Sequence, residues 1–252
     1  MEIKIVIPTY RRPGNVTTLK VISPCILCVA ESEEALYRER HPGVEIVAHP
    51  NSVVGLAPKR QWIYDYFGDV FMLDDDISHA RRLYLASGTK KATELTPDEI
   101  YEIIQRCGNT AHLAGCYLFG FNKAPNPIIY NPFTPIAMSG LVTGCAIGLL
   151  HGSRIKYSPE SVAVEDFWVA GLNAYFHRKA FIDLRFNFVQ EETFKRAGGL
   201  GLYRTIDMER NDTMFLRRMF GDAITMKEEV FGGGRTMTRN HNPYGRTMRV
   251  PF

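Results

Sequence analysis

The stretch Val-Phe-Met-Leu-Asp-Asp-Asp-Ile, residues 70–77, places three consecutive aspartates directly after four apolar residues. A short run of large apolar side chains predicts a strand that is buried on both faces. Three adjacent carboxylates repel one another and raise one another's pKa, so folding alone gives no reason for them. A divalent cation between them offsets the repulsion, because Mg²⁺ takes oxygen ligands. The alternative is a solvated acidic loop without a function, since short acidic runs are usually solvated.

Strands and helices alternate through the first half of the chain around this stretch. We expect strands at residues 3–7, 26–30, 44–48 and 70–73, and helices at 31–40 and 57–67. Such alternation predicts an α/β fold with a mainly parallel central sheet flanked by helices. Ligands of such sheets bind beyond the carboxyl ends of the strands. Residues 9–12 and 74–76 both follow strands, so we expect them to face one crevice.

The second half of the chain is less regular in its pattern. Thr96 and Glu99 form a capping box with Pro97 at the first helical position, which predicts a helix over 97–113. Further strands are expected at 116–122, 128–130, within 139–150, at 184–189 and at 223–226, and further helices at 164–177 and 206–220. Without an internal repeat or a linker, the chain is expected to form a single domain with an irregular C-terminal half.

The composition is that of an ordinary globular protein. Of the 252 residues, 45% are apolar and 23% are charged, which suffices for a core without covalent staples. No apolar run reaches the about 20 residues that span a bilayer. The N-terminus lacks a basic segment followed by an apolar one, so we expect no signal peptide. We therefore expect no membrane insertion and a cytoplasmic location.

The cysteines favour a structural role in a reduced compartment. Their number is five, which is odd and suits a protein without disulfides. Cys25 and Cys28 have the spacing of a redox or zinc half-site, but no second pair of this spacing follows. Because they lie in or next to a predicted strand, buried cysteines are the better interpretation.

The C-terminal tail, residues 231–252, carries basic side chains and no acid. Its basic and titratable residues are Arg235, Arg239, His241, Arg246 and Arg249. The net charge of the chain is only +3, so this local concentration is more informative than the total. A tail of this kind suits contact with the phosphates of a nucleotide or a nucleic acid. The alternative is a solvated and frayed terminus.

Four segments carry a family resemblance when they are taken in order. They are residues 6–12 (VIPTYRR), 51–60 (NSVVGLAPKR), 68–76 (GDVFMLDDD) and 164–168 (VEDFW). Together they resemble nucleotide-sugar glycosyltransferases of the GT-A fold, closest to the large family-2 type. The chain is also similar to the TET-associated glycosyltransferases of phages, which are thought to add sugars to hydroxymethylated bases in DNA. It departs from the pattern at Arg11, where Asn is common, and at 59–61, where Lys-Arg-Gln replaces Ala-Arg-Asn.

The resemblance implies a role for each motif. The residues expected to bind the nucleotide sugar are Pro8, Thr9, Tyr10, Arg11, Asn51, Lys59, Arg60, Asp74 and Asp75. Asp76 and Asp74 would hold Mn²⁺ or Mg²⁺, with His241 as a third ligand or a phosphate contact. Asp166, with Glu165 beside it, is the expected general base for the acceptor hydroxyl. Acids at the start of a helix are also what the helix dipole alone favours.

The residues themselves support part of this assignment. In an extended backbone Asp74 and Asp76 point to one face and Asp75 to the other. Asp75 is therefore expected to serve the structure and to tolerate substitution best of the three. Lys59 and Arg60 begin a helix, where their charges oppose the dipole, which indicates a functional reason such as a nearby phosphate.

The implied activity is metal-dependent, inverting transfer of a sugar from a nucleoside-diphosphate sugar, a UDP-sugar in the first instance. The expected acceptor is the hydroxyl of 5-hydroxymethylcytosine in DNA, and a saccharide acceptor is the alternative. Residues 1–78 would bind the nucleotide sugar and residues 79–230 the acceptor, in the cytoplasm of a bacterial host if a phage encodes the chain. A nucleotidyltransferase is a further alternative, although its Gly-rich first loop would hold only Gly14 here. A non-enzymatic nucleic-acid-binding module is the last alternative, and no signature motif supports it.

Overall fold

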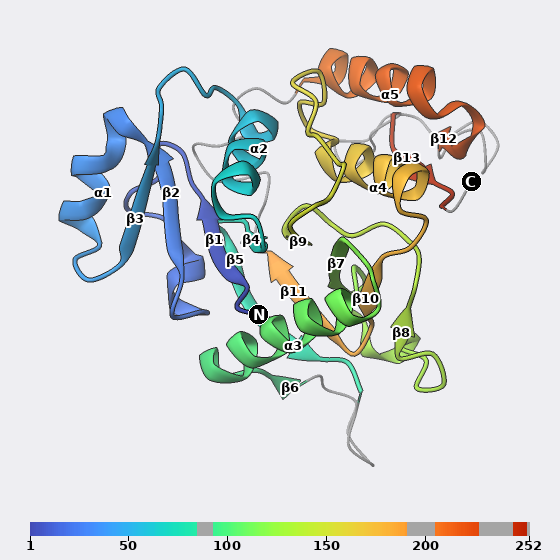
Figure 1. The fold of residues 1–252 in the computed structure, drawn as a ribbon, viewed down its shortest axis with the longest axis horizontal. Coiled ribbons are helices and arrows are strands. Elements are labelled where there is room, and N and C mark those ends of the chain that lie inside the picture. Colours follow the sequence, from blue (N-terminus) through green and yellow to red (C-terminus); the bar gives the residue numbers. More distant parts are fainter. Residues whose placement is uncertain (85–92, 191–204, 227–243, 251–252) are drawn as a thin grey trace.

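The computed structural model describes residues 1–84, 93–190, 205–226 and 244–250. These residues form an eight-stranded central sheet with the strand order β3-β2-β1-β4-β9-β7-β10-β8 (Figure 1). The strands are β1 (Lys4–Pro8), β2 (Ile26–Ala30), β3 (Glu45–His49), β4 (Val70–Leu73), β7 (Leu118–Phe121), β8 (Ile136–Ala137), β9 (Ala146–Leu149) and β10 (Phe181–Asp183). Strands β3, β2, β1 and β4 run parallel, as do β7 and β10, while β9 runs antiparallel to both of its neighbours. The predicted α/β fold with a mainly parallel central sheet flanked by helices is confirmed, and it is consistent with the GT-A type.

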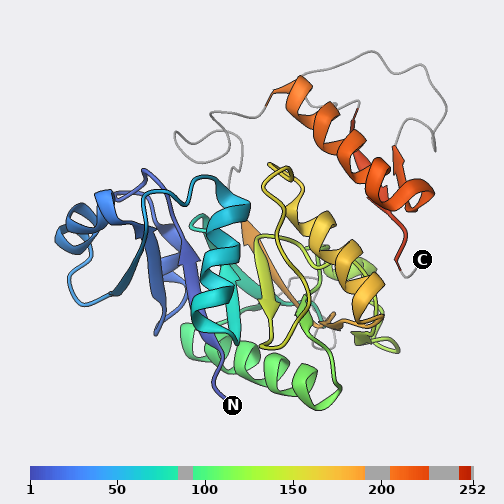
Figure 2. The ribbon, with the colours of Figure 1, turned by 45° about the horizontal axis from the view of Figure 1, so that its top comes forward.

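Helices cover the two faces of this sheet. They are α1 (Glu34–Arg40), α2 (Leu56–Phe67), α3 (Pro97–Leu113) and α4 (Glu165–Phe176), and a further helix, α5 (Ile206–Phe220), packs on α4. Figure 2 shows α3 on one side of the sheet and α2 and α4 on the other. A smaller sheet, β11-β5-β6, joins β11 (Phe186–Gln190), β5 (Ile77–Arg82) and β6 (Thr93–Glu94). None of the described helices has both the length and the apolar character needed to cross a bilayer.

The apolar strands divide their side chains between two core layers. In β1, Ile5 packs into the layer on the α3 side, whereas Val6 packs into the layer beneath α2 and α4. In β4, Phe71 and Met72 divide in the same way. Each buried side chain of this size stabilises the fold by about 1.5–3 kcal/mol. Because both faces are covered, these strands are uniformly apolar instead of alternating.

Most of the predicted elements are confirmed, and the structure departs from the prediction at a few places. Residues 128–130 are not a strand, because the Asn126 side chain accepts a hydrogen bond from the Ile128 N–H and starts the 3₁₀ helix Pro127–Ile129. The strand within 139–150 is limited to β9, after a left-handed backbone conformation at Gly140. The expected helix 31–40 begins as the 3₁₀ helix Glu31–Glu33. The strands β5, β6, β8, β10 and β13 were not predicted. Cys28 is buried within β2, as expected, whereas Cys25 lies just before β2 and is only half-buried.

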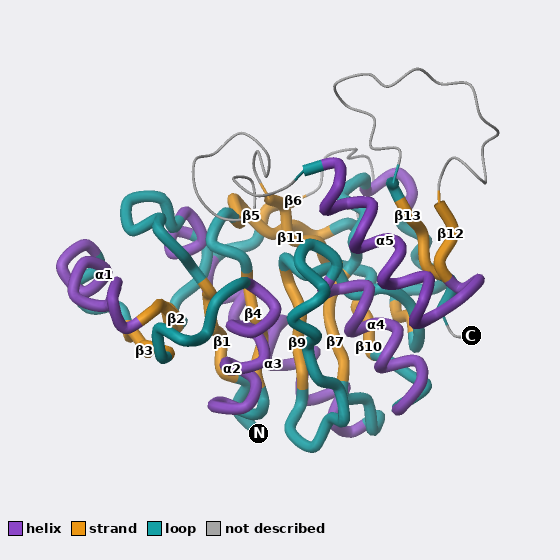
Figure 3. Tube along the Cα trace, turned by 90° about the horizontal axis from the view of Figure 1, so that it is seen from above, coloured by secondary structure: helices purple, strands orange, loops and turns teal. Residues whose placement is uncertain are grey.

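A small C-terminal unit, residues 205–226 and 244–250, packs against α4 (Figure 3). It consists of α5 and the antiparallel pair β12 (Ile224–Met226) and β13 (Arg246–Met248). The Phe215 and Trp168 rings lie 5.1 Å apart between their centroids and join α5 to α4. Arg246 forms a buried ion pair with Glu209. This part of the predicted basic tail is therefore folded against the protein and does not form a frayed terminus.

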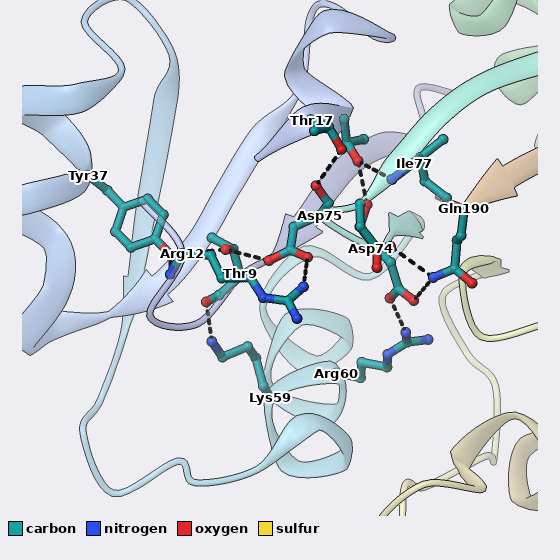
Figure 4. Close-up of polar contacts among 12 residues, drawn as sticks. Thr9, Arg12, Thr17, Tyr37, Lys59, Arg60, Asp74, Asp75, Ile77 and Gln190 are labelled. Atoms are coloured by element: carbon teal, nitrogen blue, oxygen red, sulfur yellow. Dashed lines mark hydrogen bonds and ion pairs between the residues drawn. The ribbon is translucent and has the colours of Figure 1, made fainter. Parts of the chain in front are cut away.

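Asp75 ties the loop after β1 to the end of β4 (Figure 4). The Thr9 hydroxyl donates to Asp75 Oδ2 over 2.7 Å, and Arg12 Nη1 donates to Asp75 Oδ1 over 2.9 Å. Tyr37 Oη accepts a hydrogen bond from the Arg12 N–H and lies 3.0 Å from Thr9 Oγ1. The side chains of Asp75 and Arg12 are each only 9% exposed. The structural role of Asp75 is confirmed, but these contacts contradict the expectation that this position tolerates substitution best.

We predict that Asp75→Ala lowers the free energy of unfolding by ~3 kcal/mol, because it leaves the buried Arg12 guanidinium without this carboxylate. Urea denaturation at neutral pH measures the change. Asp65→Ala is the control, since Asp65 forms an ion pair with Lys156 in which both side chains are more than half exposed. That change should cost less than about 1 kcal/mol. Equal losses for the two variants would refute the structural role of Asp75.

Candidate active site

A cavity of about 720 Å³ opens beyond the carboxyl ends of β1, β2, β3 and β4, and we call it the donor-side cavity. Its size is typical of pockets for small ligands. Eight of the residues predicted for the site line it: Pro8, Thr9, Tyr10, Asn51, Lys59, Asp74, Asp75 and Asp76. The expectation that the loops after β1 and β4 face one crevice is confirmed.

Aromatic and cationic groups lie together on one wall of the donor-side cavity. Lys59 Nζ lies 5.5 Å from the centroid of the Tyr10 ring and donates a hydrogen bond of 2.7 Å to the Thr9 carbonyl. Burial lowers the pKa of Lys59. Arg11 is exposed, with a left-handed φ of 54°, and does not line the cavity, whereas Arg12 does. Of the two arginines after β1, Arg12 therefore lines the cavity and pairs with Asp75, whereas the binding of the nucleotide sugar by Arg11 stays a prediction.

Asp74 and Asp76 converge on the side chain of Gln190, at the end of β11. Figure 4 shows Gln190 beside Asp74. Gln190 Nε2 donates to Asp74 Oδ2 over 2.8 Å and to Asp76 Oδ1 over 2.9 Å. The prediction that these two carboxylates share a face is confirmed. Burial raises the pKa of Asp74 to about 6, the charges of Asp76 and Asp75 add to the rise, and Arg60 opposes it. Gln190 was missed because it lies more than 100 residues from the aspartates and belongs to no local motif.

Arg60 is the counter-ion behind these carboxylates. Its guanidinium donates to Asp74 Oδ1 over 2.7 Å and to the Gly144 carbonyl over 2.6 Å. It lies 3.7 Å from Glu165 Oε1, and its side chain is only 1% exposed. Arg60 is not among the residues that line the donor-side cavity, and its observed partners are these carboxylates; its direct contact with the nucleotide stays a prediction.

A second cavity, of about 450 Å³, adjoins the first, and we call it the acceptor-side cavity. Glu165, Asp166 and Lys123 are among the residues that line it. Asp74 and Gln190 line both cavities, together with Leu56. The two acidic groups, the aspartates after β4 and the acids at the start of α4, lie far apart in the sequence. In the structure they border two cavities that meet at Asp74 and Gln190.

Glu165 and Asp166 differ in how they are held. Glu165 is buried beside Arg60, and burial raises its pKa to about 7, with a further contribution from Asp166 and an opposing one from Arg60. Asp166 is less buried. Its Oδ1 accepts a hydrogen bond of 2.8 Å from the Phe167 N–H, and its Oδ2 lies 3.5 Å from the Gly144 N–H. Burial also raises the pKa of Asp166. Asp166 is thus the more accessible carboxylate of the pair.

Gly144 allows the close approach of these charged groups. A Cβ at this position would lie 3.0 Å from Glu165 Oε1 and 3.4 Å from Arg60 Nη1. Any larger residue would press against a buried carboxylate and its counter-ion. The glycine therefore contributes to the site by leaving space for the Arg60–Glu165 pair. The presence of a glycine in the sequence did not indicate this role.

The carboxylate pair fits a divalent cation. Asp74 Oδ2 and Asp76 Oδ1 both lie within 2.9 Å of one nitrogen, so oxygens from two side chains converge on a single point. Across the described ranges, no three His, Cys, Asp or Glu side chains group as a complete metal site. Mg²⁺ is often held by one or two carboxylates with substrate phosphates completing its coordination, so two acids suffice. His241, the expected third ligand, lies outside the described residues, as do Arg235 and Arg239.

Comparisons with known proteins complete the description of the site. No curated protein sequence matches the chain. A solved structure titled "Crystal Structure of A197 from STIV" is similar at 10% sequence identity and a TM-score of 0.38, covering 76% of this chain and 86% of that one. The sequence profile of the TET-Associated Glycosyltransferase family matches residues 3–199, which include both cavities. The chain therefore belongs to the family of TET-associated glycosyltransferases.

Proposed function

We propose that this glycosyltransferase moves a sugar from a UDP-sugar to the hydroxyl of 5-hydroxymethylcytosine in DNA, with inversion and with Mn²⁺ or Mg²⁺ as cofactor. Membership of the family makes the chain a glycosyltransferase, which uses a nucleotide-sugar donor. One observation carries the proposal: the donor-side and acceptor-side cavities meet at Asp74 and Gln190. Asp166 lines only the acceptor-side cavity, on the side from which a hydroxyl would attack.

The donor-side residues suit a nucleoside diphosphate. The exposed part of the Tyr10 ring offers a surface on which a base can stack, and Lys59 lies beside it. Asp76 and Asp74 would hold the cation in place of the Gln190 contact. When bound, that cation would neutralise the charge that develops on the diphosphate leaving group.

The acceptor-side residues suit an inverting transfer. The acceptor oxygen forms a bond to the anomeric carbon while the bond from that carbon to the diphosphate oxygen breaks. The electron pair of the broken bond leaves with the diphosphate, and the hydroxyl proton passes to Asp166. Glu165 stays beside Arg60 and helps to orient the neighbouring Asp166 carboxylate. Attack from the side opposite the leaving group inverts the configuration of the sugar.

A DNA acceptor is supported by the family and by charge. The chain belongs to the TET-associated glycosyltransferases, and the resemblance of its motifs to these enzymes implies hydroxymethylated bases in DNA as acceptors. Lys123 is exposed and lines the acceptor-side cavity, where its ammonium group can meet a phosphate. A saccharide acceptor would need no such cation. Supplying labelled UDP-sugars with either hydroxymethylated DNA or oligosaccharides decides between them, and label found only in the oligosaccharides would refute a DNA acceptor.

We predict that Asp76→Asn and chelation of divalent cations each reduce sugar transfer at least about 100-fold, because both remove stabilisation of the leaving group. Donor turnover measures both effects, with added Mn²⁺ for the variant and with chelator for the unaltered enzyme. Asp98→Asn, the same charge change at an exposed position in the first turn of α3, should leave the rate unchanged. Full activity in the chelated enzyme would exclude a metal-dependent mechanism.

We predict that Asp166→Asn separates donor binding from transfer. The rate of transfer to hydroxymethylated DNA should fall about 10²- to 10⁴-fold, because the amide cannot take the acceptor proton. Calorimetric titration with UDP and Mn²⁺ should give the affinity of the unaltered protein, since Asp166 does not line the donor-side cavity. Unchanged transfer by this variant would rule out Asp166 as the base.

We predict that kcat/KM falls as the pH is lowered through about 7, because the Glu165–Asp166 pair then gains a proton.

Glu165 has a raised pKa in the folded state, so the folded protein binds more protons than the unfolded one between about pH 4.5 and 7. Its contribution to stability is therefore greatest below this window and is lost as the pH rises through it. Glu165→Gln should flatten this part of the stability profile in urea denaturation, and an unchanged profile would contradict the assignment.

A further inference from the structure

One short segment, residues 159–163, forms part of the wall of both cavities. Pro159, Ser161 and Val162 line the donor-side cavity, and Ala163 lines the acceptor-side cavity. The segment ends directly before Val164 and the start of α4, whose first turn carries Glu165 and Asp166. Its position therefore fixes the shape of the donor-side wall and the placement of the catalytic carboxylate together.

The Asp212 side chain on α5 holds this segment through two adjacent amides. Asp212 Oδ2 accepts a hydrogen bond of 2.9 Å from the Ala163 N–H, and Oδ1 accepts one of 3.3 Å from the Val162 N–H. Val162 belongs to the wall of the donor-side cavity and Ala163 to the wall of the acceptor-side cavity. Asp212 is only 2% exposed, so the hydrogen bonds are shielded from competition with water. Bonds to an ionised acceptor are also stronger than those between neutral groups.

The C-terminal unit keeps Asp212 in place. Three residues before it, Glu209 forms the buried ion pair with Arg246 of β13. The adjacent Thr213 hydroxyl donates to the Tyr244 carbonyl over 3.2 Å. One turn further along α5, Phe215 packs on Trp168 of α4. Asp212 is thus fixed on a helix that is itself attached to α4, the element that carries Asp166.

We propose that Asp212 is a positioning residue, which acts through Val162 and Ala163 to align the donor-side wall with the catalytic carboxylates of α4. The proposal rests on the proposed function, in which Asp166 is the base. Asp212 lines neither cavity, so it acts on the reaction only through the segment that it holds. It lies beyond residues 3–199, so this support comes from a part of the chain that the family profile does not include.

The test is Asp212→Asn in the full chain. Asparagine keeps the size of the side chain, but its NH₂ group replaces one of the two acceptor oxygens. That NH₂ group would face a backbone N–H, and two donors cannot form a hydrogen bond with each other. We expect the KM for the UDP-sugar to rise and kcat to fall, each by about tenfold, because small displacements at a reacting centre are costly. Calorimetric titration with UDP and Mn²⁺ should show a weaker affinity of similar size.

Two control variants separate positioning from charge and from stability. Asp222→Asn makes the same charge change at an exposed residue of the C-terminal unit and should leave both constants unchanged. Ile104→Val changes a fully buried side chain of α3 and lowers the Tm without touching the segment. At a temperature below every Tm, it too should leave KM and kcat unchanged.

The outcomes for Asp212 and for the proposed function are distinct. Wild-type KM, kcat and UDP affinity in Asp212→Asn would overturn the positioning role, as would losses that Ile104→Val reproduces at the same decrease in Tm. Unchanged transfer by Asp166→Asn would instead refute the proposed base. In that case a weaker UDP affinity of Asp212→Asn would still show that Asp212 holds the donor-side wall, because UDP binding involves no transfer.

Discussion

The buried guanidinium of Arg60 is the interaction on which the site depends. It binds Asp74 on the donor side and lies beside Glu165 on the acceptor side, so one cation sets the separation of two carboxylates from distant parts of the chain. A buried cation is tolerated only when paired charges and hydrogen bonds replace its hydration. The hydrogen bond to the Gly144 carbonyl supplies part of that replacement. Arg60 therefore links the carboxylates that border the two cavities.

The three aspartates after β4 divide into two functions because successive side chains of an extended chain alternate in direction. Asp75 turns toward Thr9 and Arg12 and joins two neighbouring strand ends. Asp74 and Asp76 turn the other way and converge on Gln190. A single acidic run thus provides a structural tie on one side and a pair of converging carboxylates on the other. Its concentration of charge is balanced locally by Arg12 and Arg60.

Sequence predicted the features that depend on near neighbours. The apolar runs of β1 and β4 and the capping box of α3 are local, so their positions followed from pattern alone. The shared face of Asp74 and Asp76 is also a local property of the chain. Gln190 and Asp212 were missed because their partners lie about 50 to more than 100 residues away in the sequence. The contact of Arg60 with Glu165 could not be predicted for the same reason, since the two residues are far apart in the sequence.

The antiparallel strand β9 has a consequence for how the chain can be divided. It lies between β4 and β7 and contributes residues 146–149 to the middle of the sheet. The first four strands are therefore not self-sufficient, because β4 would present an unpaired apolar edge until β9 docks on it. A fragment that ends at residue 78 would expose this edge and tend to aggregate. The two halves of the site are chemically distinct, yet the chain must fold past residue 149 before either of them exists.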